Sequence, residues 1–147
     1  MIPKVALLSY GESGYALPVE SMEHILPSPQ VFSLPLLQQQ FSGVFLYEQH
    51  VVPLFKLFRL LKPGVSISPP PLAFVVLFLT EFGILGLPAT QVQCVVDRAA
   101  GSIEPFSEKK GARIQRAFVL DGEKFPLLDT TSVLAYLLEG SENTEEA

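Results

Sequence analysis

The sequence contains one cysteine, two histidines and few charged residues, and each shortage excludes a class of protein. Cys94 has no second cysteine for an intramolecular disulfide, and with His24 and His50 it cannot complete a Cys/His metal site. We therefore predict no metal and no cofactor, and a reducing, cytoplasmic location. The longest apolar run, residues 72–79, is too short to span a bilayer as a helix, and no signal-peptide core is present. Direct membrane insertion is not expected.

Basic residues are also few, and only 17% of the chain is charged. Most of the formal charge of −5 comes from four glutamates in the last nine residues, at positions 139, 142, 145 and 146. Without them the body of the protein is close to neutral and has no basic stripe, so we do not expect nucleic acid as a partner. We expect residues 139–147 to form an acidic disordered tail.

Apolar residues, in contrast, are abundant. They make up 48% of the chain, and the mean hydropathy is +0.36. This is more than a core of this size requires, so part of the apolar surface should be exposed and available to a partner.

Thirteen prolines and ten glycines divide the chain into short segments rich in β-branched and aromatic residues, a pattern typical of an all-β domain. Three hairpins are expected, pairing residues 5–10 with 15–19, 72–80 with 84–87, and 117–120 with 123–128. The last has an Asp121-Gly122 turn.

Two short helices are also expected. Leu54, Leu57, Phe58 and Leu61 have helical spacing, which predicts a helix over residues 54–61. An Asp-Thr-Thr-Ser sequence can cap a second helix over residues 132–138.

The two halves of the chain resemble each other. A shift of 70 residues places four residues on identical ones and matches further apolar positions, among them Met22 with Val92 and Ile25 with Val95. We predict two similar small β-barrels, at about residues 1–62 and 72–138, joined by a proline-rich linker at 62–71. Each half is too small to be stable alone, so the two should share a core or exchange strands.

Motifs for catalysis are nearly absent, and we predict no catalytic residues. Cys94 with a histidine would make a small enzyme possible, but a lone cysteine is more often a buried core residue, and His50 is expected to face solvent from a strand. Glu20 and Glu23 resemble an acid/base pair. They fit better as the polar face of a half-buried segment whose apolar face lines either a core or a groove.

Five ordered segments resemble the CheW-like domain of chemotaxis coupling proteins. They are Tyr15-Ala-Leu-Pro-Val-Glu-Ser-Met-Glu-His-Ile-Leu26, Leu34-Pro35, Gly43-Val-Phe-Leu-Tyr-Glu-Gln-His-Val-Val-Pro-Leu54, Leu85-Gly-Leu-Pro88, and Leu127-Leu-Asp129 before the closing helix. The resemblance implies a single domain over residues 1–138, all-β, with two intertwined five-stranded SH3-like β-barrels and short helices.

The resemblance also implies a non-catalytic adaptor in bacterial chemotaxis signal transduction. Such an adaptor joins the cytoplasmic tip of a chemoreceptor to the regulatory domain of a chemotaxis histidine kinase. The tip, a helical hairpin, would lie in a groove lined here by Val19, Met22, Ile25 and Val92. The kinase side would be Leu46, Tyr47, Glu48, Gln49 and His50.

Residues 46–49 depart from the family pattern, which usually has Asn-Leu-Arg-Gly there. Gln49 would cost about 1–2 kcal/mol in the left-handed conformation of a tight turn, so we expect this loop to be rearranged. Glu48 would repel an acidic group on a partner. Two hypotheses follow: a divergent coupling adaptor, or a competitor and array filler that binds receptor but not kinase.

Overall fold

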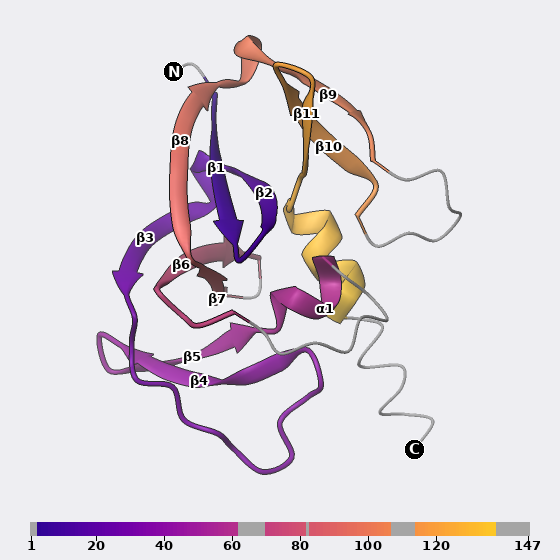
Figure 1. The fold of residues 1–147 in the computed structure, drawn as a ribbon. Coiled ribbons are helices and arrows are strands. Elements are labelled where there is room, and N and C mark those ends of the chain that lie inside the picture. The colour runs from indigo at the N-terminus through magenta and orange to yellow at the C-terminus, as the bar shows by residue number, and fades with distance from the viewer. Residues whose placement is uncertain (1–2, 62–69, 82, 107–113, 138–147) are drawn as a thin grey trace.

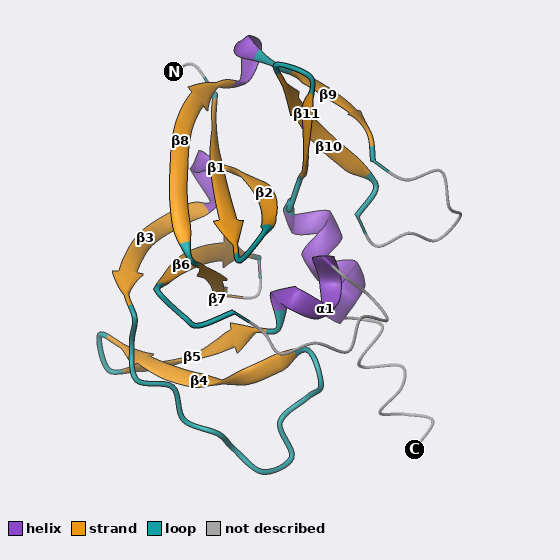
Figure 2. Cartoon of the chain, viewed as in Figure 1, coloured by secondary structure: helices purple, strands orange, loops and turns teal. Residues whose placement is uncertain are grey.

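The computed structural model describes residues 3–61, 70–81, 83–106 and 114–137. The expected acidic tail and most of the predicted linker lie outside these residues. The described part is all-β, as predicted (Figure 2). Its strands are β1 (Lys4–Tyr10), β2 (Ser13–Pro18), β3 (Met22–Pro27), β4 (Phe41–Tyr47), β5 (His50–Phe55), β6 (Phe74–Thr80), β7 (Gly83–Ala89), β8 (Gln91–Asp97), β9 (Ser102–Pro105), β10 (Arg116–Leu120) and β11 (Glu123–Pro126).

The helical elements are short. They are the α-helix α1 (Leu57–Leu61), the 3-10 turns η1 (Val19–Ser21) and η2 (Arg98–Ala100), and a closing helix over residues 130–137. The three predicted hairpins are confirmed as β1–β2, β6–β7 and β10–β11. In both halves a hairpin is followed by a third strand, a second hairpin and a helix, as the internal repeat predicts, although the second half has an additional strand, β9, before its second hairpin.

The strands of the two halves are exchanged between sheets (Figure 1). The β1–β2 hairpin of the first half pairs with β8, and the β6–β7 hairpin of the second half pairs with β3 and β5. The sheets run β2-β1-β8, β11-β10-β9 and β3-β6-β7-β5-β4, and a bridge between Ala16 and Leu127 joins the first two. Closure of these sheets into two barrels, and division of the chain at the linker, stay predictions.

The largest buried cluster also draws on both halves, with Leu8 and Leu17 from one and Phe78 and Leu87 from the other. Tyr15 is fully buried in it and donates a hydrogen bond from its hydroxyl to the carbonyl oxygen of Pro88, at 2.9 Å. Burial raises the pKa of Tyr15 far above its usual value, so the phenol stays a donor. This bond links the strand proline of the second half to the first hairpin.

The predicted helix over residues 54–61 is shorter than expected and begins at Leu57. Leu54 belongs to β5, where it pairs with Gly43 of β4 and with Gly86 of β7. Pairing on both sides outweighs the local helical spacing at Leu54.

The expected rearrangement of the 46–50 loop is also wrong. Glu48 and Gln49 form a two-residue turn between the paired residues Tyr47 and His50. Both have positive φ, at 47° and 69°, like Asp121 and Gly122 in the β10–β11 turn, at 51° and 81°. Such turns match the right-handed twist of paired strands. The pairing of β4 with β5 therefore holds Gln49 in a conformation that it disfavours by itself.

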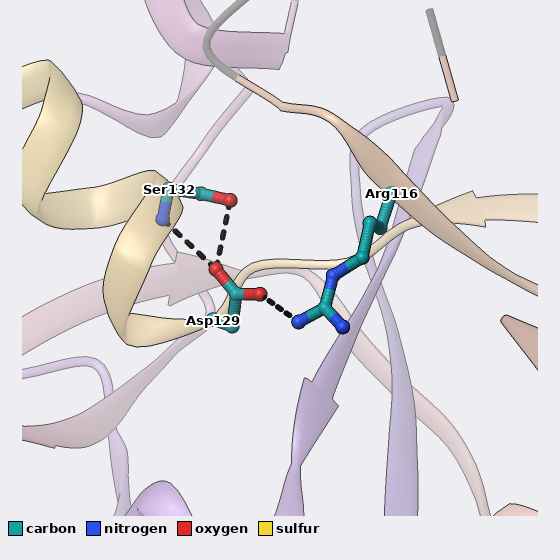
Figure 3. A network of polar contacts seen from close by, with 3 residues as sticks. All are labelled: Arg116, Asp129 and Ser132. Carbon is teal, nitrogen blue, oxygen red and sulfur yellow. Dashed lines mark hydrogen bonds and ion pairs between the residues drawn. The ribbon is translucent and has the colours of Figure 1, made fainter. Parts of the chain in front are cut away.

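Asp129 caps the closing helix and joins it to β10 (Figure 3). Its Oδ1 accepts hydrogen bonds from the amide and the hydroxyl of Ser132, at 2.8 and 2.9 Å, and its Oδ2 forms an ion pair with Arg116. Partial burial raises the pKa of the Asp129 carboxyl, but the bonds from Arg116 and Ser132 outweigh it and leave the pKa below its usual value. The stabilisation is present above the unfolded pKa and is lost as the pH falls through the folded one.

Replacing Gln49 by glycine should relieve the strain of the β4–β5 turn. Glycine adopts positive φ without a steric cost, so Gln49→Gly should raise the free energy of unfolding by roughly 1 kcal/mol in urea titrations. Gln38→Gly is the matched control, because Gln38 is exposed and its φ is not positive. It should lower stability by about 0.5 kcal/mol. Equal destabilisation by both substitutions would contradict a strained turn.

Substitutions at Asp129 should separate helix capping from the ion pair. Asp129→Asn keeps a capping oxygen and should lower the free energy of unfolding by less than about 1 kcal/mol, whereas Asp129→Ala should lower it by about 1–2 kcal/mol. In urea titrations at pH 7 and pH 3, the difference between the native protein and Asp129→Asn should shrink at the lower pH. A difference independent of pH would contradict the ion pair.

Candidate partner-binding surfaces

The four residues predicted to line a groove are brought together by the fold. Val19 lies in η1, Met22 and Ile25 in β3, and Val92 in β8. All four are partly buried and pack against the largest core cluster. Residues from two different sheets therefore share one apolar neighbourhood.

A β-bulge explains why Met22 and Ile25, three residues apart, face the same way. The register of β3 on β6 pairs Met22 with Phe78 and then His24 with Leu77, so Glu23 is an extra residue. Ile25 pairs next with Val76. Because Phe78 and Val76 are two apart on one strand, their partners lie on one face of the sheet.

The same bulge occurs in β8 at Gln93, which the internal repeat matches to Glu23. Val92 pairs with Leu8, Cys94 with Leu7, and Val95 with Ala6. Since Leu8 and Ala6 face the same core cluster, Val92 and Val95 lie on one face. Val95 is 52% exposed. It was missed as a site residue, although the 70-residue shift had matched it to Ile25.

We call Val19, Met22, Ile25, Val92 and Val95 the apolar strip. Its strands β3 and β8 are each the outer strand of their sheet (Figure 1). No further strand in the described part of the chain pairs with the open edge of either. Both strand edges are therefore open, and of the strip residues Val95 is the most exposed.

The second predicted surface lies on the β4–β5 hairpin. Leu46, Glu48, Gln49 and His50 are exposed, and Tyr47 is half-buried against a core cluster, with its ring centroid 6.3 Å from that of His24. Leu46 and Val51 pair across the two strands and are 60% and 62% exposed. The solvent-facing position expected for His50 is confirmed.

Phe32 extends this hairpin surface and was not predicted. It bridges to Val44 on the free side of β4 and is 43% exposed. Paired residues face the same side of a sheet, and Val44 and Leu46 are two apart, so Phe32, Leu46 and Val51 share one face. We call these three residues the hairpin face.

Among the described residues, Cys94 forms no hydrogen bond or ion pair with His24 or His50. Cys94 is exposed, so its expected burial is wrong: β8 is an outer strand, which leaves the cysteine uncovered. Cys94 lies in the β2-β1-β8 sheet, whereas His24 and His50 lie in the five-stranded sheet. Glu20 and Glu23 are both exposed.

A metal-binding cluster and a membrane-spanning helix are both absent from the described residues. No group of three or more His, Cys, Asp or Glu side chains there could hold a metal ion. Within the same ranges, no helix combines the length and the apolar character that crossing a bilayer requires.

Comparison with known proteins agrees with the fold described above. A family model described as CheW-like domain matches residues 4–137. Among solved structures, the chain is similar to the scaffolding protein TtCheW from Thermoanaerobacter tengcongensis. The TM-score is 0.70 at 16% sequence identity, over 88% of this chain and 90% of that one. At this identity the likeness shows a shared fold. No curated protein matches the sequence.

Proposed function

The chain belongs to the CheW-like domain family, and on this ground we propose that it is a non-catalytic adaptor coupling chemoreceptors to a histidine kinase in the bacterial cytoplasm. The observation that carries the proposal is the apolar strip. Two outer strands present apolar side chains over a core shared by both halves, and Val95 among them is half exposed. Such a surface suits a helical partner that contributes apolar residues of its own.

The proposed partner on the strip is the cytoplasmic tip of a chemoreceptor, a helical hairpin. The apolar face of its helices would contact Val19, Met22, Ile25 and Val92. Val95 would lie nearer the rim of this interface. Since the strip residues are only partly buried in the free protein, their burial by a partner contributes to binding.

The proposed kinase contact is the hairpin face together with the turn beside it. Leu46 and Val51 form an exposed apolar pair, which suits the centre of a small interface. Tyr47, Glu48, Gln49 and His50 would border it. The strip and the hairpin face contain different strands, so one adaptor molecule could hold both partners at once.

Two valines offer a matched test of these two surfaces. Val95→Glu should weaken binding of the receptor tip at least tenfold and leave binding of the kinase regulatory domain unchanged, because it places a charge in the strip alone. Val51→Glu should do the reverse. Both valines are more than half exposed on strands, so both variants should fold. Calorimetric titration against each fragment measures the effects.

The possible outcomes of these two substitutions are distinct. Loss of both partners by either variant, with the fold intact by circular dichroism, would contradict two separate surfaces. If the native protein bound neither fragment, the coupling function itself would be refuted.

A second candidate function rests on Glu48, an exposed acid at the turn of the proposed kinase contact. In this candidate function the protein would bind the receptor but not the kinase, and it would act as a competitor or as a filler in the receptor array. An acid facing acidic groups on the kinase would oppose binding by like-charge repulsion.

Reversing this charge tests the second candidate. If Glu48 blocks the kinase, Glu48→Arg combined with Gln49→Gly should create measurable kinase affinity where the native protein shows none. Gln49→Gly alone is the control, because it changes the turn without changing the charge. Unchanged binding in the double variant would mean that this turn does not decide kinase binding.

A further inference from the structure

The repeated part of the apolar strip cannot by itself fix the direction of a helical partner. Met22 and Ile25 on β3 correspond in the internal repeat to Val92 and Val95 on β8, and each pair flanks a bulge. A helix laid across these four residues would meet similar apolar contacts in either direction. Any preference must come from residues that the repeat does not duplicate.

Such residues lie in a pocket of about 320 Å³ next to the strip. Glu20 and Ser21 of η1 line it, together with Lys4 of β1 and Arg98 of η2. Val19 is the first residue of the same 3-10 turn. One short element therefore borders both the strip and the pocket.

Two charges in the pocket lack a partner. Arg116 and Asp129, which also line it, neutralise each other, and Lys4 Nζ lies 3.9 Å from Asp97 Oδ1. Glu20 and Arg98 are exposed, and neither forms an ion pair within the described ranges. Their charges are opposite and come from two different 3-10 turns.

The repeat provides no second copy of this charge pair. A shift of 70 residues places Thr90 at the position of Glu20 and Ser28 at the position of Arg98. This pair of opposite charges therefore has no counterpart elsewhere along the strip.

We propose that Glu20 and Arg98 fix the direction in which the helical partner lies on the apolar strip. The inference rests on the proposed receptor-binding function. The partner that fits has an acidic side chain for Arg98 and a basic one for Glu20 at the same end of its apolar face. Exposed ion pairs add little affinity, but the reversed orientation brings like charges together or leaves the pair unmatched. The pair thus selects a direction more than it strengthens binding.

Directional crosslinking tests this inference. With Cys94→Ser in the background, Ala100→Cys places one reporter thiol in the same turn as Arg98. The probe is the receptor-tip hairpin fragment of the same organism, with a single cysteine at one end or the other of its apolar face. We expect one end to form the disulfide at least tenfold more efficiently.

The charge variants identify the cause. In the variant with Glu20→Gln and Arg98→Gln, the crosslinking efficiencies of the two ends should come within twofold of each other. The affinity for the fragment should change less than fivefold. Glu123→Gln with Lys124→Gln is the matched control, because these charges are exposed on β11 and do not line the pocket. This control variant should keep the preference of the crosslink for one end of the fragment.

The inference is overturned if both ends react equally in the unaltered charge background, or if the preference survives Glu20→Gln with Arg98→Gln. Calorimetry on the same fragment tests the proposed function separately. Absence of binding there refutes both proposals, whereas binding without direction refutes this one alone.

Discussion

The exchange of hairpins between the two halves is the constraint on which the rest of the structure depends. Two of the three sheets combine strands of both halves, because β1–β2 pairs with β8 and β6–β7 pairs with β3 and β5. The main core cluster is built from both hairpins, and the buried Tyr15 hydroxyl bonds to Pro88 across the exchange. Half a chain of this size would bury too little apolar surface to be stable. Each half is therefore stable only together with the other.

The same exchange creates the candidate receptor surface. When β3 and β8 cross to the opposite hairpin, each becomes the outer strand of its sheet. The bulges at Glu23 and Gln93 then bring a second apolar residue of each strand, Ile25 and Val95, onto the same face as the first. An apolar strip at the junction is thus a consequence of how two incomplete halves complete each other.

Sequence reasoning succeeded where the determinants are local. Asp121-Gly122 specifies a hairpin turn, and the Asp129 cap specifies where the closing helix starts. It failed where the outcome depends on distant pairing. Leu54 is held in β5 by Gly43 and Gly86, Gln49 is held in a left-handed turn by the pairing of β4 with β5, and Cys94 is exposed because β8 has a free edge. Val95 was within reach of the repeat, since its match Ile25 was already a site residue. Phe32 was not, because its bridge to Val44 has no sequence pattern.

The connections that follow the third strand of each half contribute to the two surfaces that the repeat does not duplicate. Between β3 and β4 the first half has a long connection that contains Phe32, which joins the hairpin face. Between β8 and β10 the second half has η2 and β9, which supply Arg98 and Ile103 to the charged pocket. The repeated strands build what the halves have in common, the core and the apolar strip. The unequal connections distinguish one end of the molecule from the other, as the proposed adaptor with two different partners requires.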